Sequence, residues 1–161
     1  MTRWKETLGL RAFGLFKIPL IFSCRPTVEA LDDRAAEIKI PLNFWTRNHL
    51  KSMYFGTLAI GADCAGGLLA MHLIRKSGKK LSLVFRDFRA DFLRRPESDV
   101  HFRCEDGAKV RRLIASAIKT KKRVSQPVRI TATTPKVSGT EPVAVFDLTL
   151  SLKPISDHRN S

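Results

Sequence analysis

About 25 residues, most of them apolar or small, lie between Ser52 and Gly78, and this run restricts the fold more than any other part of the sequence. The hydroxyl of Ser52 is a suitable N-terminal cap and Gly78 is a suitable stop, so the run predicts one helix of roughly 38 Å. A single carboxylate, Asp63, lies near its centre. Because an unpaired carboxylate is unstable in a protein interior, we expect Asp63 to be paired, hydrated or retained for chemistry.

The same run raises the question of a membrane span, since residues 53–74 are about long enough to cross a bilayer. Asp63 and the many glycines and alanines around it argue against a span. Near the N-terminus, Arg11, Lys17 and Pro19 interrupt the apolar residues, so no signal peptide is expected. We therefore predict a buried helix in a cytoplasmic protein without a membrane span.

Alternating apolar and polar residues on both sides of the run predict an antiparallel sheet with one apolar face. Such a face is the surface that a long apolar helix needs for its burial. The alternation fails around residues 86–88, where we expect a bulge or a change of facing. Asp106 is expected to cap a second, shorter helix with apolar residues at helical spacing. The expected strands are 28–31, 36–42, 81–93, 100–105, 128–133 and 144–152, with a hairpin loop at 135–142.

The chain of 161 residues is long enough for one domain with a sizeable core. We divide it into an N-terminal amphipathic helical segment (1–26), a main domain (27–153) and a C-terminal tail (154–161). The first segment is expected to contain a short helix that lies on the main domain, because four apolar residues recur among charged ones. These residues are Trp4, Leu8, Phe13 and Phe16.

The segment RNHLKSMYFGTLAIGAD, residues 47–63, gives this layout a more specific interpretation. Asn48 is followed six residues later by Tyr54, and Asp63 lies nine residues after Tyr54. These spacings resemble those of the hotdog-fold acyl-CoA thioesterases of the phenylacetate-degradation type, which carry an Asn, a His-Gly-Gly turn and an Asp or Glu on the central helix. Within that superfamily, the chain looks most like an uncharacterised, hotdog-like bacterial branch. The resemblance implies an α+β hotdog fold: an antiparallel sheet wrapped around a long central helix, with an N-terminal helix and one extra helix between late strands.

The resemblance also implies roles for individual residues. The backbone amide of Phe55, together with Gly56, would hold the carbonyl oxygen of a thioester, and Tyr54 would line the same substrate-binding turn. Asp63 would be the nucleophile or the base that activates water, and Asn48 would orient the substrate or the water. We expect acyl-CoA as substrate or ligand, no cofactor and no metal, and a homodimer or a dimer of dimers.

In this sequence Tyr54-Phe55-Gly56 stands where the family has His-Gly-Gly. The alternative function is therefore a non-catalytic module that binds an acyl group or acyl-CoA. Three residues also have structural interpretations that stay open at this stage. Asp63 could pair with an arginine or backbone amides at a subunit interface, Tyr54 could be a packing aromatic, and Asn48 could cap a loop.

The net charge of +14 and the pI near 10.4 favour anionic partners. Six basic residues are candidates for binding the phosphates of coenzyme A. Alternatively, they form a solvated basic face. Nucleic acid is not the expected partner, because the sequence has no helix-turn-helix, zinc spacing or aromatic RNA-binding motif. The six residues are Lys79, Lys80, Arg86, Arg89, Arg94 and Arg95.

The three cysteines are odd in number and far apart, so we expect reduced thiols and neither a disulfide framework nor a zinc site. Cys64 is expected to be a small core residue and not a nucleophile, since no histidine is marked as its base. His49 and His72 are expected to be ordinary packing or surface residues.

Overall fold

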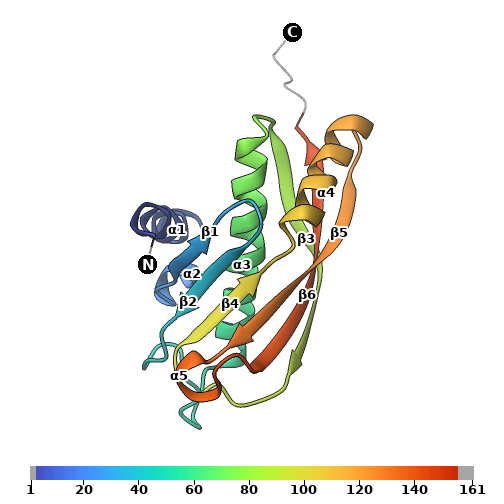
Figure 1. Ribbon diagram of the computed structural model, residues 1–161. Coiled ribbons are helices and arrows are strands. Elements are labelled where there is room, and N and C mark those ends of the chain that lie inside the picture. Colours follow the sequence, from blue (N-terminus) through green and yellow to red (C-terminus); the bar gives the residue numbers. More distant parts are fainter. Residues whose placement is uncertain (1–2, 156–161) are drawn as a thin grey trace.

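The computed structural model describes residues 3–155 as an α+β fold in which one sheet curves around one long helix (Figure 1). Most of the predicted C-terminal tail therefore lies outside the described residues. The elements in chain order are α1 (Trp4–Lys17), α2 (Pro19–Ser23), β1 (Thr27–Leu31), β2 (Ala36–Ile40), α3 (Phe55–Lys76), β3 (Leu81–Phe92), β4 (Val100–Cys104), α4 (Gly107–Thr120), β5 (Val124–Thr133), α5 (Pro135–Ser138) and β6 (Pro142–Pro154).

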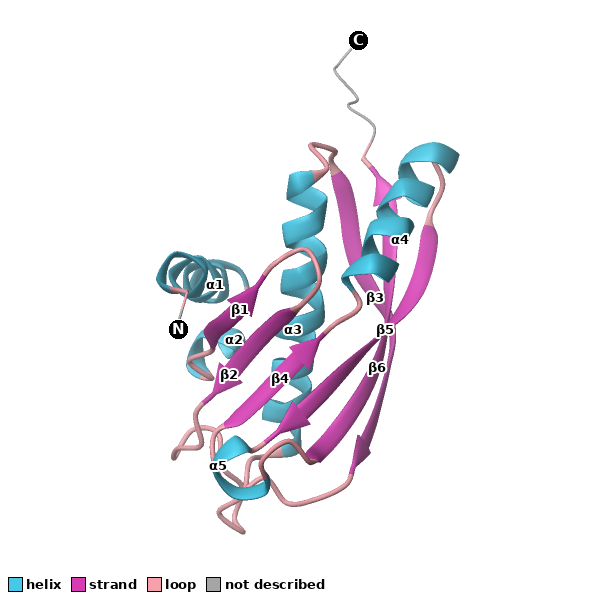
Figure 2. Cartoon of the chain, in the orientation of Figure 1, coloured by secondary structure: helices cyan, strands magenta, loops and turns pink. Residues whose placement is uncertain are grey.

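The six strands form one antiparallel sheet in the order β1-β2-β4-β5-β6-β3. Figure 2 shows the sheet twisting around α3, with β1 and β3 at its two edges. The inward-facing residues of β6 alternate along the strand and are buried against the helix. The predicted architecture of a sheet wrapped around a central helix is confirmed.

Helix α3 lies in the core because its side chains are apolar and small. At Gly61 a Cβ atom would lie 2.3 Å from Cε2 of Phe102, so only glycine lets strand β4 pack this closely. By length and composition alone, the helix could cross a membrane. In the folded protein, however, 56% of its most apolar 18-residue stretch is buried. The burial matches the predicted core helix.

The start of α3 differs from the prediction. The helix begins at Phe55, and its N-terminal cap position is Tyr54 and not Ser52. Ser52 is buried, and both its amide and its hydroxyl donate to the side-chain oxygen of Asn48. Its hydroxyl therefore stabilises the preceding loop instead of the helix. The end is as expected, since Gly78 follows the helix with a φ of +67°.

The predicted irregularity in β3 is a bulge. Phe85 pairs with Leu150 and Phe88 pairs with Leu148, so β3 uses one residue more than β6 between these pairs. The extra residue keeps both phenylalanines opposite buried leucines of β6. The bulge therefore preserves the apolar face of the strand across the interruption.

The later part of the chain follows the predicted order with two local differences. Asp106 is the residue before α4, but its side chain does not cap the helix. One carboxylate oxygen instead accepts from the amide of Arg129 at 2.8 Å, and the other pairs with Lys109 at 3.0 Å. The predicted loop at 135–142 contains the short helix α5, which is followed by Gly139 with a φ of +59°.

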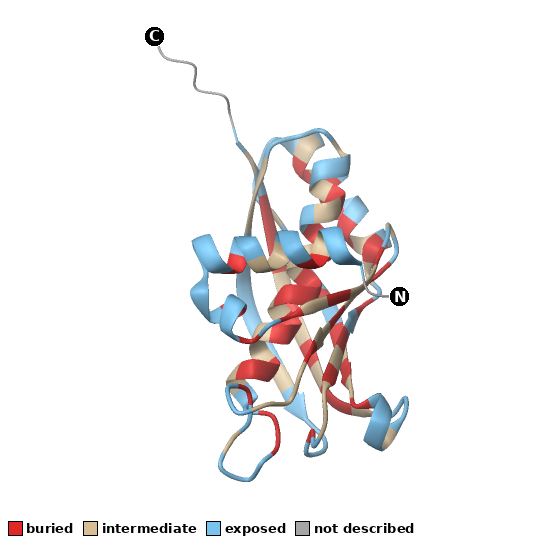
Figure 3. Cartoon of the chain, turned by 90° about the vertical axis from the view of Figure 1, so that its left-hand side faces the viewer, coloured by how far each residue is buried: buried red, intermediate tan, exposed pale blue. Residues whose placement is uncertain are grey.

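Helix α1 lies on the main domain as expected, but with the opposite face inward. Trp4, Leu8 and Phe16 are 75%, 66% and 79% exposed. Figure 3, in which α1 faces the viewer, shows exposed residues along most of this helix. The physical reason is that Arg3, just before α1, and Thr7 and Arg11 within it hydrogen-bond to the chain around β1. The apolar residues are therefore left outside.

Candidate functional site

The loop before α3 is held in place by Thr46, which is fully buried. Its hydroxyl accepts from the amide of Asn43 at 2.9 Å and donates to the carbonyl of Pro41 at 2.7 Å. Its carbonyl accepts from the amide of Tyr54, also at 2.9 Å. These bonds connect the end of β2 to the first turn of α3, so the helix start has a fixed position relative to the sheet.

Asn48 caps the turn at the tip of this loop. Its Oδ1 accepts from the amides of Leu50 at 2.9 Å and Ser52 at 3.2 Å. The arrangement corresponds to the loop-capping interpretation of Asn48. Its carbonyl oxygen is used by the loop, and the Nδ2 group is the part of the side chain left to donate to a ligand.

The first turn of α3 presents backbone amides that no side chain caps. The first amides of a helix lack partners within the helix, and the helix dipole adds a partial positive charge there. This end is suited to an oxyanion or another negative group. The predicted turn Tyr54-Phe55-Gly56 lies at this position.

Aromatic rings surround these amides. A Cβ atom at Gly56 would lie 2.5 Å from Cε1 of Tyr54, so the tyrosine ring occupies the space beside the glycine. The rings of Tyr54 and Phe55 are 4.7 Å apart, and the ring of Phe55 lies 6.4 Å from that of Phe92 at the end of β3. Tyr54 and Phe55 are both exposed. The amides are thus bordered by aromatic rings that a ligand would contact.

A cavity of about 660 Å³ opens beside these rings, between the loop, the start of α3 and the chain after β3. Asn48, Tyr54 and Phe55 line it, whereas Gly56 and Asp63 do not. His49, Phe92 at the end of β3 and the residues that follow it also line the cavity, and no sequence motif links them to the loop before α3. The full lining is Asn48, His49, Leu50, Ser52, Met53, Tyr54, Phe55, Leu58, Phe92, Leu93, Arg94, Arg95 and Pro96.

Asp63 lies two turns further along α3, about 12 Å beyond Phe55 along the axis. Its Oδ1 lies 3.8 Å from the Cβ position of Gly67, and the ring of Phe85 from β3 reaches within 3.7 Å of the same position. Among residues 3–155, no group forms a hydrogen bond or ion pair with Asp63. Burial raises the pKa of its carboxyl above the ordinary value, which favours the protonated form and increases its basicity.

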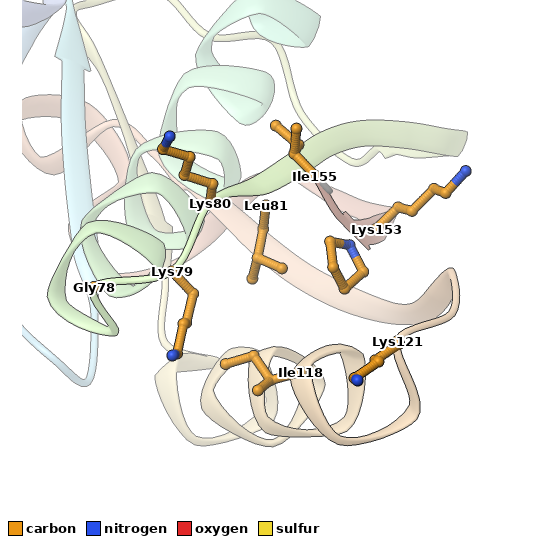
Figure 4. Close-up of a pocket in the computed structure, with 9 residues that line it drawn as sticks. Gly78, Lys79, Lys80, Leu81, Ile118, Lys121, Lys153 and Ile155 are labelled. Carbon is orange, nitrogen blue, oxygen red and sulfur yellow. The ribbon is translucent and has the colours of Figure 1, made fainter. Parts of the chain in front are cut away.

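The six basic residues proposed for phosphate binding are divided among three places. Arg94 and Arg95 line the cavity just described, while Arg86 and Arg89 are exposed on β3. Lys79 and Lys80 belong to a second cavity of about 530 Å³ at the opposite end of α3. Figure 4 shows lysine side chains around the apolar side chains there. The labelled residues are Gly78, Lys79, Lys80, Leu81, Ile118, Lys121, Lys153 and Ile155.

Among residues 3–155, the cysteines and histidines form no second centre. All three cysteines are free and buried, and burial raises the pKa of the Cys104 thiol to about 11 and that of Cys64 further. Cys64 is a core residue, as predicted. His72 contacts Asp33 at 3.2 Å. In the part of the chain that the structure describes, no three His, Cys, Asp or Glu side chains gather as metal ligands.

The antiparallel sheet and the long central helix define a hotdog fold, and known structures share it. A candidate thioesterase of Shewanella oneidensis superposes with a TM-score of 0.77 over 94% of this chain and 100% of its own, at 13% identity. A protein of unknown function from Pseudomonas aeruginosa, itself a candidate thioesterase, gives 0.75 over 92% and 96%, at 20% identity. A thioesterase of Haemophilus influenzae gives 0.64 over 87% and 86%, at 17% identity.

The sequence places the chain more narrowly within this fold. Residues 9–150 match the family described as Domain of unknown function (DUF4442), and the chain belongs to that family. No curated protein matches the chain in sequence.

Proposed function

We propose that this protein hydrolyses acyl-CoA thioesters as a homodimer, by the chemistry of the phenylacetate-degradation type of hotdog thioesterase. The observation that carries the proposal is the uncapped start of α3, which lies at a cavity of about 660 Å³. The same helix carries Asp63, which has no partner among the described residues. The fold supports the proposal, since thioesterases are among the structures that share it.

In the proposed reaction, the amides of Phe55 and Gly56 donate to the thioester oxygen as negative charge develops on it. The Asp63 carboxylate takes a proton from a water molecule, and the water oxygen bonds to the carbonyl carbon. When the tetrahedral intermediate collapses, the carbon–sulfur bond breaks and the thiolate leaves, taking up the proton. The raised pKa of Asp63 makes it a better proton acceptor. The Nδ2 group of Asn48 donates to the substrate.

Two uncovered surfaces on one side of the chain support the proposed homodimer. Strand β3 is a 12-residue edge strand with exposed side chains, and such an edge readily pairs with another strand. Beside it, α3 presents a partly exposed stripe that includes Asp63, Gly67 and Met71. Antiparallel pairing of two β3 strands would cover both surfaces around a twofold axis.

This pairing would also complete the site. The two α3 helices would run antiparallel. The partner's Asp63 would then approach the 660 Å³ cavity of the first chain, which has no carboxylate in its lining. Each site would combine Asn48 and the amide of Phe55 from one chain with the partner's Asp63. The second cavity, which contains Lys79 and Lys80, would then lie in the partner subunit at the same end as Arg94 and Arg95. These cations would together face the phosphates of a bound coenzyme A.

A second function is favoured by one observation. The ring of Tyr54 fills the space beside Gly56. With a smaller residue at position 54, this space would be open. A site closed in this way suits a protein that binds acyl-CoA without hydrolysing it.

The Asp63→Asn variant separates the two functions in an assay of acyl-CoA hydrolysis with short, long and aromatic acyl groups. We expect the wild-type protein to hydrolyse at least one class, and the variant to lose about 10²-fold or more. Glu105→Gln, a change at an exposed carboxylate outside the site, is the matched control and should retain full activity. If the wild-type protein is as slow as Asp63→Asn with every acyl group but still binds acyl-CoA, the binding function replaces the enzymatic one.

Mixing two inactive variants tests whether the site is shared. Asn48→Asp keeps the oxygen that the loop uses but loses the donating amide, and Asp63→Asn loses the base. In a mixed dimer with shared sites, one site carries both changes and the other carries neither, so activity returns after subunits exchange. If each site lies within one chain, every site keeps one defect and mixing restores nothing.

A further inference from the structure

Helix α1 has its polar face turned toward the protein. Arg3, Thr7 and Arg11 are spaced four residues apart, which places them on one side of the helix. The amide of Arg3 donates to the carbonyl of Val28 at 2.9 Å, and Thr7 Oγ1 accepts from the amide of Val28 at 2.9 Å. The Nε of Arg11 donates to the carbonyl of Pro26 at 3.0 Å. These hydrogen bonds attach the helix to β1 and its flanking residues.

The outward face of α1 is apolar, and α2 extends it. Gly14 allows the close packing of the two helices, since a Cβ atom there would lie 2.8 Å from the amide nitrogen of Phe22. An apolar surface of this kind on a helix ordinarily faces a core or a partner. We name it the N-terminal apolar surface; it consists of the exposed residues Trp4, Leu8, Phe13, Leu15, Phe16, Ile18, Leu20 and Phe22.

The charges around this surface identify the kind of partner it fits. Residues 3–25 contain five cations and only one acid, Glu6, which already pairs with Arg3 at 2.9 Å. Lys5 and Lys17 are exposed beside the apolar residues. The five cations are Arg3, Lys5, Arg11, Lys17 and Arg25.

A second copy of the chain fits this surface poorly. In a twofold contact, the N-terminal apolar surfaces of two copies would face each other. The lysines of one copy would then meet no free acid on the other. A bilayer with anionic lipid supplies both an apolar interior and negative headgroups. Trp, Phe and Leu beside Lys and Arg are the residues of helices that lie in a membrane interface.

The position of the surface is also compatible with the proposed dimer. Helix α1 lies at the β1 edge of the sheet, and β3 forms the opposite edge (Figure 1). Contact with a bilayer through α1 therefore leaves β3 accessible for pairing. We infer that α1 and α2 form a membrane-docking site that inserts Trp4, Leu8 and Phe16 into the interface of a bilayer carrying anionic phospholipid.

The two tryptophans of the chain allow a direct test with vesicles of phosphatidylcholine and phosphatidylglycerol in equal amounts. Trp45→Phe leaves Trp4 as the reporter, and Trp4→Phe leaves Trp45, which is exposed in the loop before α3. We expect the Trp4 emission to shift to the blue and to be quenched by brominated lipid acyl chains. The Trp45 emission should change little. Vesicles of phosphatidylcholine alone, or high salt, should weaken the response of Trp4.

Cosedimentation with the same vesicles measures how tightly the matched variants bind compared with the wild type. The double variant Trp4→Ser, Phe16→Ser should bind more than about tenfold more weakly, because both side chains leave the apolar phase. Val137→Ser, which removes an exposed apolar residue from α5, should bind like the wild type. Circular dichroism checks that each variant is folded, and all three residues are exposed, so folding is expected to persist.

Three outcomes would overturn the inference. In the first, the double variant binds vesicles as tightly as the wild type. In the second, Trp45 and not Trp4 responds to lipid, which assigns the contact to the loop before α3. In the third, the double variant lowers the oligomeric state measured by light scattering without vesicles, which assigns the N-terminal apolar surface to a second copy of the chain.

Discussion

Helices α1 and α3 are both rich in apolar residues, yet they turn opposite sides toward the protein. Helix α3 buries its apolar and small residues under the sheet and leaves its one carboxylate, Asp63, partly solvated without a partner. Helix α1 directs Thr7 toward β1 and leaves Trp4 in solvent. The difference teaches that apolar content does not decide which face of a helix is buried. The groups on the neighbouring element decide it: an apolar sheet face receives α3, and backbone donors and acceptors of β1 receive α1.

The largest expected contrast comes from removing a leucine from each helix. Leu69 of α3 is fully buried, so Leu69→Ala should lower the free energy of unfolding by about 2–5 kcal/mol through lost burial and a cavity. Leu8 of α1 is 66% exposed, and Leu8→Ala should change it by less than about 0.5 kcal/mol. Urea unfolding measures both. A large loss for Leu8→Ala would mean that its side chain packs against the protein or a second copy.

Adding one methyl group to each helix sharpens the comparison. The new Cβ of Gly61→Ala would overlap the ring of Phe102, which is fully buried, and should destabilise the protein by about 1–3 kcal/mol. Gly9 of α1 has no atom within 4 Å of its Cβ position, so Gly9→Ala should stabilise the protein by about 0.5–1 kcal/mol. Thermal unfolding of the two variants should therefore shift in opposite directions. Shifts of the same sign would contradict the close contact at Gly61.

The smallest expected effect concerns the pH dependence of stability. The pKa of Asp63 is raised in the folded protein by burial, so its carboxyl keeps a proton there at a pH where the unfolded chain has lost it. Its contribution to stability should fall as pH rises from the ordinary pKa to the raised one, and stay constant above that. Asp63→Asn removes this fall and should be more stable than the wild type at neutral pH. Equal unfolding curves for the two proteins from acid to neutral pH would argue that Asp63 is hydrated.

The fold could be predicted from sequence because its main elements follow local patterns. The alternation in β6, the apolar spacing in α4 and the failed alternation at residues 86–88 each depend on neighbouring residues. The facing of α1 could not be predicted in this way. The partners of Thr7 and Arg11 are mainly backbone groups of residues 25–28. Sequence patterns do not mark which backbone groups are unpaired.

The candidate site was predictable in part for a related reason. The spacing from Asn48 to Tyr54 places both around one cavity, because they belong to one continuous loop. The separation of Asp63 from that cavity depends on the rotation and length of α3. The lining from Phe92 to Pro96 comes from a distant part of the chain, with no shared motif to mark it.

The bulge in β3 has a consequence for how the length of this chain can change in evolution. Deleting one residue between Phe85 and Phe88 would restore regular two-residue alternation and keep both phenylalanines opposite the same leucines of β6. Deleting a residue elsewhere in β3 would shift the rest of the strand by one position and turn its apolar side chains to the other face of the sheet. Among homologous sequences, single-residue gaps within this strand should therefore accumulate at positions 86 and 87.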